Sequence, residues 1–190
     1  MPDLREELQQ CFQGRVCLMG LGNIDYGDDG FGAIITEAIT GRLKMEGEIT
    51  LAHDIINAGT MPERFIKTIA EKGINHLIFL DTVEFGGTPG SVVFLNTEEI
   101  SARFPQISTH KISLDLLAKC VEEEGTKAWL LGVQPGSLKF EKGLTPAVQI
   151  TLEILTELIC DVWTSTKETG EHILCAERQP TALFMEEVKI

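Results

Sequence analysis

Carboxylate and imidazole side chains stand at three separate places between apolar segments of the sequence. Asp28 and Asp29 are adjacent in a glycine-rich turn, Asp81 directly follows four apolar residues, and His110 precedes a helical pattern. Two carboxylates and an imidazole from separate loops can form an open site for a divalent transition metal, and imidazole suits nickel, zinc or iron. A metal in such a site can turn a bound water into a nucleophile near neutral pH. These residue types therefore predict a metal site or a proton-transfer site.

Each of these residues also has an ordinary structural explanation. Asp28 or Asp29 could cap the helix that is expected to begin at Gly30, because an aspartate there accepts backbone N–H bonds. One cap needs only one side chain, which leaves the other aspartate for a ligand or acid–base role. Asp81 could bind nearby backbone N–H groups, and His110 could make a local hydrogen bond. The three places together favour a functional site more than any one of them does.

Other catalytic designs fit the sequence poorly. It contains neither a GxSxG nucleophile motif nor an HExxH metalloprotease motif. Gly20-Leu21-Gly22 follows an expected strand, as in dinucleotide-binding proteins, but Asp25 occupies the position of the third glycine and the nearby acids would repel a pyrophosphate. A nucleotide-binding protein, with Asp54 as the ribose-binding acid, is therefore a weak alternative. The five cysteines form no CxxC pair and predict neither a disulfide framework nor a zinc site.

The elements that must position these side chains alternate along the chain. Strands are expected at residues 15–21, 49–56, 76–80, 91–95 and 127–133, and helices at 2–12, 31–47, 62–72, 97–104, 112–125 and 145–163. This alternation predicts an α/β protein, a three-layer α/β/α sandwich with a five-stranded, mostly parallel sheet. About ten residues without a helical pattern join strands three and four, too few for a parallel crossover, so strand four is expected to be antiparallel. Ligands bind such sheets at the carboxyl ends of the strands, where Asp29, Asp81 and His110 are expected.

Composition and charge argue against nucleic-acid binding and membrane insertion. The chain has 190 residues and a net charge of −13, from 16 basic and 29 acidic residues, and it has no basic stripe, so nucleic-acid binding is not expected. No apolar run approaches the ~20 residues of a membrane span, so membrane insertion is not expected. The N-terminal residues do not resemble a secretion signal, which predicts a cytoplasmic protein. We expect a single domain over residues 1–163, with a lead-in helix within 1–13, and a tail, 164–190, that is either docked or disordered.

Several motifs in consistent order resemble those of the hydrogenase maturation endopeptidases. A GxGN motif followed by two acids and a glycine is present as Gly20-Leu21-Gly22-Asn23 and Asp28-Asp29-Gly30. The other matches are Leu80-Asp81, Pro89-Gly90, Ser108-Thr109-His110, Leu131-Gly132-Val133-Gln134-Pro135 and Gly143-Leu144-Thr145-Pro146. The resemblance covers roughly residues 14–163 and is far more specific than any one motif.

The resemblance implies an activity and a substrate. Members of this family remove a C-terminal extension from the precursor of the large subunit of nickel–iron hydrogenases, after nickel has been inserted. The family's metal-site residues correspond to Asp29, Asp81 and His110, which would recognise nickel already held by the substrate, so no permanent cofactor is expected. Asp28 would then be free to cap the helix. Either a carboxylate such as Asp29 or Asp81 acts as general base, or the nickel polarises water or the scissile carbonyl.

One departure from the family pattern leaves an alternative open. Many relatives have Asp-Gly-Gly in the turn after the second strand, where this chain has Asn57-Ala58-Gly59. Asn57 cannot ionise, which puts any acid role assigned to that position in doubt. A non-catalytic chaperone that binds the nickel-loaded large subunit is therefore the second hypothesis.

Overall fold

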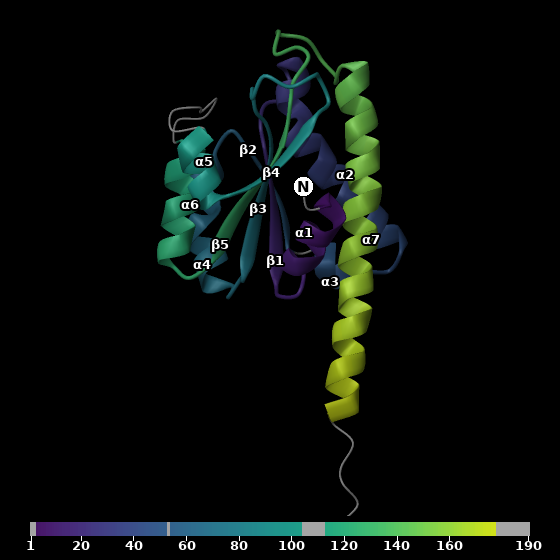
Figure 1. Cartoon of the computed structure of the whole chain (residues 1–190). Coiled ribbons are helices and arrows are strands. Elements are labelled where there is room, and N and C mark those ends of the chain that lie inside the picture. The colour runs from purple at the N-terminus through teal and green to yellow at the C-terminus, as the bar shows by residue number, and fades with distance from the viewer. Residues whose placement is uncertain (1–2, 53, 104–112, 178–190) are drawn as a thin grey trace, which may run out of the picture.

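The computed structural model of the chain describes residues 3–52, 54–103 and 113–177, which contain a five-stranded sheet (Figure 1). The strands are β1 Val16–Leu21, β2 Ile55–Gly59, β3 His76–Thr82, β4 Val92–Asn96 and β5 Lys127–Val133. Their order in the sheet is β2-β1-β3-β5-β4. Strand β4 is antiparallel to β5, and the other neighbours are parallel. The predicted mixed sheet and the reversed direction of the fourth strand are confirmed.

Helices cover both faces of the sheet, which confirms the three-layer sandwich. One face carries α1 Leu4–Cys11, α2 Phe31–Met45 and α7 Pro146–Glu177, and the other carries α4 Ile66–Glu71, α5 Thr97–Arg103 and α6 Leu114–Glu123 (Figure 1). A short helix, α3 Ile49–Ala52, and the 3-10 turns η1 Gly27–Gly30 and η2 Pro62–Phe65 complete the described elements. Within the residues that the structure describes, no helix combines the length and the hydropathy of a membrane span.

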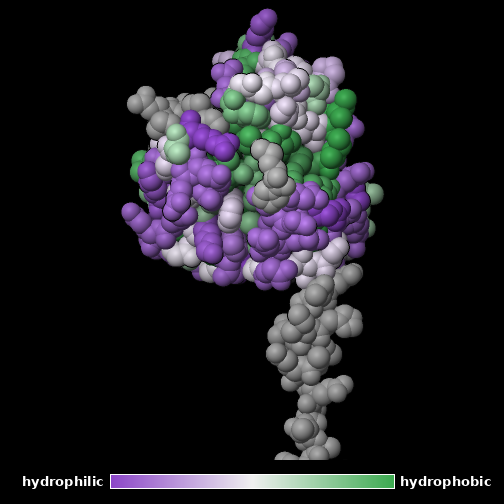
Figure 2. Space-filling view, in the orientation of Figure 1, coloured by the Kyte–Doolittle hydropathy of each residue, from purple (hydrophilic) through white to green (hydrophobic). Residues whose placement is uncertain are grey.

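Buried apolar side chains fill the space on either side of the sheet. All six residues of β1 are buried, as expected for a central parallel strand with helices on both faces. The rings of Phe12 and Trp163 stack with centroids 5.3 Å apart, which fixes the end of α1 against α7. Figure 2 shows that apolar surface gathers over the centre of the face seen in Figure 1, where β4 forms an edge of the sheet, and that the surface below it is hydrophilic.

The segment 49–56, predicted as a single strand, folds differently. Its first residues form helix α3, and β2 begins only at Ile55, which pairs with Leu18 of β1. Ile49 is 57% exposed, so its β-branched side chain does not enter the sheet. Just before this segment, the backbone N–H of Glu48 bonds back to the Leu43 carbonyl at the end of α2 and does not pair with a strand. Tertiary context here overrides the strand propensity of the individual residues.

Asp54 lies at the amino end of β2 and not at the carboxyl end that the sequence predicted. Its carboxylate accepts hydrogen bonds from Arg15 Nε at 2.9 Å and from Lys72 Nζ at 3.3 Å. Burial alone would raise the pKa of Asp54, but the bonds and positive charges of Arg15 and Lys72 outweigh it and hold that pKa below its ordinary value. A ribose-binding role at the carboxyl edge is thereby excluded for Asp54, and the nucleotide-binding alternative loses its acid.

Helix α7 is longer than the apolar pattern indicated. It begins at Pro146, as predicted, and continues past Trp163 to Glu177. Figure 1 shows its C-terminal part projecting beyond the body of the molecule. Adding polar residues to an existing helix is easy once the helix has been nucleated, so the end of the apolar stripe did not mark the end of the helix. The domain boundary expected at residue 163 stays a prediction, and residues 178–190 lie outside the described part.

Two glycines allow α2 to lie directly on the carboxyl ends of β1 and β3. A methyl group on Gly32 would overlap the carbonyl oxygens of Leu80 and Leu21. One on Gly20 would overlap the carbonyl oxygen of Gly32. A side chain at Gly32 would therefore lift the start of α2 away from the strand end that precedes Asp81.

Gly32→Ala is expected to lower the free energy of unfolding by roughly 3 kcal/mol, because backbone atoms that cannot move aside fill the space of the added methyl group. Gly41→Ala, in the same helix, is the matched control. Nothing lies within 4 Å of the Cβ position of Gly41, so alanine there should stabilise the protein by about 0.5–1 kcal/mol. Urea denaturation measures both changes, and equal stability of the two variants would contradict the close packing at Gly32.

Candidate functional site

The loops that carry the predicted site residues meet at one edge of the sheet. Asp28 and Asp29 lie in η1 shortly after β1, Asp81 lies near the end of β3, and Gln134 follows β5. Because β1, β3 and β5 are parallel neighbours, their carboxyl ends share one edge, at which the β5–α7 loop stands at the top of Figure 1. The structure therefore brings Asp29 and Asp81 to the same edge, as the sequence predicted.

Asp28 is completely buried and binds the loop between β5 and α7. Its Oδ2 accepts hydrogen bonds from Gly136 N at 2.7 Å, Ser137 N at 3.0 Å and Thr145 Oγ1 at 2.9 Å. Its Oδ1 accepts a further bond from Thr145 N at 2.7 Å, and its own backbone N–H bonds to Ser137 O at 2.9 Å. Donors surround this buried carboxylate, which therefore joins two loops whose residues 28 and 136 are 108 positions apart.

The expected helix cap at this position is wrong. The N-cap residues of η1 and α2 are Tyr26 and Gly30, and neither makes a side-chain cap hydrogen bond. A cap would supply the Asp28 carboxylate with one or two N–H donors, whereas the β5–α7 loop supplies three backbone N–H groups and a hydroxyl. The carboxylate is satisfied more fully by the distant loop than by the adjacent helix.

Asp29, one residue further along, has the opposite environment. It is 7% exposed, and its Oδ2 accepts a hydrogen bond from Asn23 N at 2.8 Å. Its Oδ1 is buried without a hydrogen-bond partner among the described residues. The side chain lines a cavity of about 270 Å³ together with Asn23, Tyr26, Thr60 and Leu138. A buried carboxylate oxygen without a donor is unfavourable unless an external group binds it, so Asp29 is open to a partner from outside the described chain.

The turn between β1 and η1 depends on Gly22. Its φ is 113°, in the region that favours glycine, and a methyl group there would overlap the carbonyl oxygen of Asp29. The turn folds the chain back so that the N–H of Asn23 reaches the Asp29 carboxylate. The GxGN motif in this chain therefore positions an acid.

The structure describes Asp81 but not His110. Asp81 is 4% exposed, and its Oδ1 accepts a hydrogen bond from Thr82 N at 2.8 Å. His110 lies outside the described residues, which resume at Ser113, the N-cap of α6. Within the described part of the chain, no group of three or more His, Cys, Asp or Glu side chains is arranged to hold a metal ion. The three-residue site stays a prediction.

Gln134 has a role that the sequence did not reveal. Its Oε1 accepts hydrogen bonds from Phe85 N at 2.9 Å and from Gly87 N at 3.1 Å, and its backbone bonds to Gly90 and Ser91. The side chain ties the β3–β4 loop to the end of β5, beside the site. Its place after a strand and in the motif that ends in Gln134-Pro135 singled it out, but did not reveal this role, because the donors to its Oε1 lie 49 and 47 positions away.

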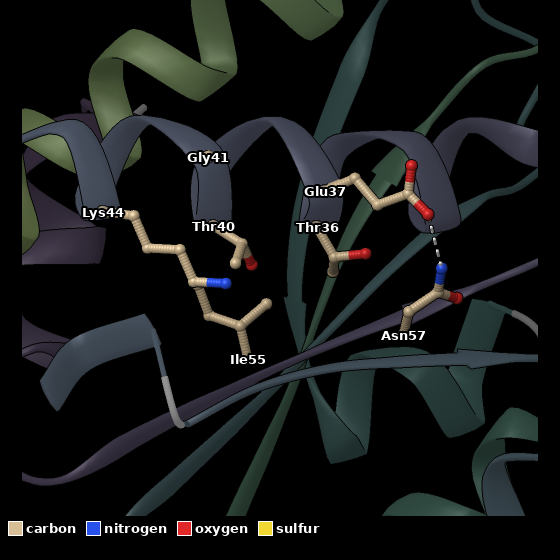
Figure 3. Close-up of a pocket in the computed structure, with 7 residues that line it drawn as sticks. All are labelled: Thr36, Glu37, Thr40, Gly41, Lys44, Ile55 and Asn57. Carbon is tan, nitrogen blue, oxygen red and sulfur yellow. Dashed lines mark hydrogen bonds between the residues drawn. The ribbon is translucent and has the colours of Figure 1, made fainter. Parts of the chain in front are cut away.

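Asn57 is absent from the described residues that line the Asp29 cavity. Its amide donates a hydrogen bond to Glu37 Oε1 at 3.4 Å, at a second cavity of about 330 Å³ between α2 and β2 (Figure 3). The other residues of that cavity are Thr36, Thr40, Gly41, Lys44 and Ile55. The amide joins α2 to β2, so its presence in place of an acid is no argument against chemistry at Asp29.

Burial makes three of the described cysteines poor nucleophiles. It raises the pKa of the Cys11 and Cys17 thiols to about 12 and that of the Cys160 thiol to about 11. Thiols with such pKa values stay protonated at neutral pH. These three thiols are therefore not candidates for the nucleophile of a reaction.

Fold and site together define an α/β protein that carries buried carboxylates, Asp29 and Asp81, at the carboxyl edge of a mixed sheet. A family model described as hydrogenase maturation protease, HycI, matches residues 35–162. The chain belongs to this family and is a peptidase of hydrogenase maturation. The resemblance drawn from its motifs is confirmed.

Individual relatives agree with this assignment. The Hydrogenase 2 maturation protease of Escherichia coli K12 is 32% identical over 161 residues, which cover 82% of this chain and 93% of that protein. The crystal structure of the [NiFe] hydrogenase maturation protease HycI from Thermococcus kodakarensis has a TM-score of 0.70 at 28% identity, and covers 83% of this chain and 99% of its own. The hydrogenase maturating endopeptidase HybD from E. coli has a TM-score of 0.62 at 28% identity, with coverage of 82% and 94%.

The two adjacent aspartates should respond differently to replacement by asparagine. Asp28→Asn would aim an NH₂ group at backbone N–H donors of the β5–α7 loop, which should lower the free energy of unfolding by about 3 kcal/mol. Asp29→Asn can keep the bond from Asn23 and place its NH₂ group where no described donor opposes it, so stability should change by less than about 1 kcal/mol. Guanidinium denaturation at pH 7 measures both, and similar losses in the two variants would contradict this division of roles.

Proposed function

We propose that this peptidase removes a C-terminal extension from the nickel-loaded precursor of a nickel–iron hydrogenase large subunit. Membership of the family supports the class of reaction. The observation that supports a metal-bearing substrate is the buried Oδ1 of Asp29, which has no partner among the described residues and belongs to a side chain that lines a cavity. A cation brought by the substrate would satisfy that oxygen.

In this proposal Asp29, Asp81 and His110 contact nickel that the precursor already holds. Carboxylate and imidazole ligands suit a divalent ion of this kind. A precursor without nickel would leave the Asp29 carboxylate unsatisfied and would therefore be spared. The recognised ion belongs to the substrate, so the protein needs no permanent cofactor of its own.

Hydrolysis adds water to the scissile carbonyl and breaks the C–N bond, which leaves a carboxylate on the mature subunit and an amine on the released peptide. In one form of the proposal, Asp29 or Asp81 takes a proton from the water as general base. In the other form, the substrate's nickel polarises the water or the carbonyl. The bond from Thr82 N to Asp81 Oδ1 keeps this carboxylate oriented at the strand end in either case.

Asn57 no longer supports the chaperone alternative. Asn57 donates to Glu37 at a cavity other than the one that Asp29 lines, so it does not weaken the case for a catalytic acid.

A cytoplasmic location remains part of the proposal. The free thiols of Cys11, Cys17 and Cys160 are in keeping with a reducing compartment.

The proposal predicts a defined loss of mass. Incubation with the protein should shorten the nickel-loaded precursor by one C-terminal peptide and leave the nickel-free precursor intact, as followed by intact-mass spectrometry. Asp81→Asn should slow the cleavage by about 10²–10⁴-fold, the range for loss of a general base, while the protein stays folded. Asp161→Asn is the control, because the Asp161 side chain is 52% exposed on α7, and it should cleave at the wild-type rate.

Two other outcomes of the mass measurement decide between the alternatives. An unchanged mass of the loaded precursor, with folded wild-type protein present, would overturn the proposal. Stable binding of the loaded precursor without any change in its mass would favour the chaperone.

A further inference from the structure

Three exposed apolar side chains stand beside the cavity that Asp29 lines. Phe140 is 79% exposed, Tyr26 is 45% exposed and Leu138 is 37% exposed. The rings of Tyr26 and Phe140 pack edge to face with centroids 5.5 Å apart, and Tyr26 and Leu138 line the same cavity as Asp29. These three side chains are named the apolar rim below. Exposed aromatic and apolar side chains grouped beside a cavity are typical of surfaces that bind another protein.

The backbone under the apolar rim is held firmly. Tyr26 and Glu141 form an isolated parallel β-bridge, and Gly27 N donates a hydrogen bond to Glu141 O at 2.8 Å. The Ser137 hydroxyl bonds to the Glu141 carboxylate, and the buried Asp28 carboxylate fixes the base of the same loop. A partner that covers side chains on a fixed backbone orders little that is not already ordered, and this favours binding.

We infer that the apolar rim binds an apolar segment of the precursor large subunit next to the bond that is cleaved, with or without nickel. This inference rests on the proposed function, because it places the partner's segment in line with Asp29. A segment that lies on Tyr26 and Leu138 continues into the cavity that Asp29 lines. Recognition then has two separate parts: the rim binds the polypeptide, and Asp29 senses the nickel.

Charges beside the rim indicate what else the segment contains. Lys139 and Glu141 flank Phe140 in sequence and Lys142 follows. All of them are exposed, so residues 139–142 carry a net charge of +1 in a chain whose net charge is −13. Most of the surface would repel an acidic segment, whereas these two lysines would attract it to the rim. The partner's segment is therefore apolar and carries an acidic side chain near the apolar residues.

Affinity for the nickel-free precursor tests the rim without interference from cleavage. Phe140→Ser should weaken this binding by about 10–30-fold, the usual effect of removing a central aromatic contact, and should raise KM for the loaded precursor while leaving kcat unchanged. Asp29→Asn should leave the affinity for the nickel-free precursor unchanged and should lower kcat/KM for the loaded precursor. Met45→Ser is the matched control, because Met45 is 90% exposed at the far end of α2, and it should behave as the wild type.

Three results would overturn the inference. One is equal affinity of wild type and Phe140→Ser for the nickel-free precursor, and another is the failure of the wild type to bind that precursor at all. The third is a loss in Phe140→Leu as large as in Phe140→Ser, because leucine keeps an apolar side chain. If the loaded precursor binds through the rim but is never shortened, the proposed function fails separately.

The acidic side chain inferred for the partner's segment is tested by a separate measurement. The double variant Lys139→Gln, Lys142→Gln should associate with the nickel-free precursor several-fold more slowly than the wild type at low salt and at the same rate at high salt. Equal association rates at low salt would remove the acidic side chain from the inferred segment.

Discussion

The buried carboxylate of Asp28 is the interaction on which the arrangement of the site depends. Its two oxygens accept three backbone N–H bonds and one hydroxyl bond from the loop that joins β5 to α7. These bonds hold the loop that carries Leu138 and Phe140 against the turn that carries Asp29. A charge buried at this depth is tolerated only when donors surround it, so the loop and the aspartate require each other.

The two adjacent acids therefore differ in how fully the protein itself satisfies them. Asp28 is bonded at both oxygens, whereas Asp29 keeps one buried oxygen that has no partner among the described residues. The close packing of Gly32 on the carbonyl of Leu80 brings the same turn to the end of the strand that carries Asp81. An unsatisfied carboxylate oxygen disfavours folding locally, and such local conflicts are expected where a protein must bind something that is not part of itself.

Local patterns in the sequence predicted four of the five strands of the described sheet, the direction of β4 and the position of Asp81, because apolar runs and loop lengths involve neighbouring residues. The donors to the Asp28 carboxylate and to Gln134 Oε1 could not be predicted in this way, because they lie between 47 and 117 positions away. The segment 49–56 was assigned wrongly because Ile49 has the side chain of a strand residue but stands outside the sheet. The motifs that resemble a known family, and not periodicity, connected the site with nickel.

Hydrogen–deuterium exchange in the β5–α7 loop tests the role of Asp28 most directly. The amides of Gly136, Ser137 and Thr145 donate to its carboxylate. We expect Asp28→Asn to speed their exchange by about 10–100-fold, as the loss of charge-assisted hydrogen bonds implies, and Asp29→Asn to leave them as protected as in the wild type. Amides within β3 are the internal reference and should not change. Unchanged protection of the three amides in a folded Asp28→Asn protein would contradict the central role of this carboxylate.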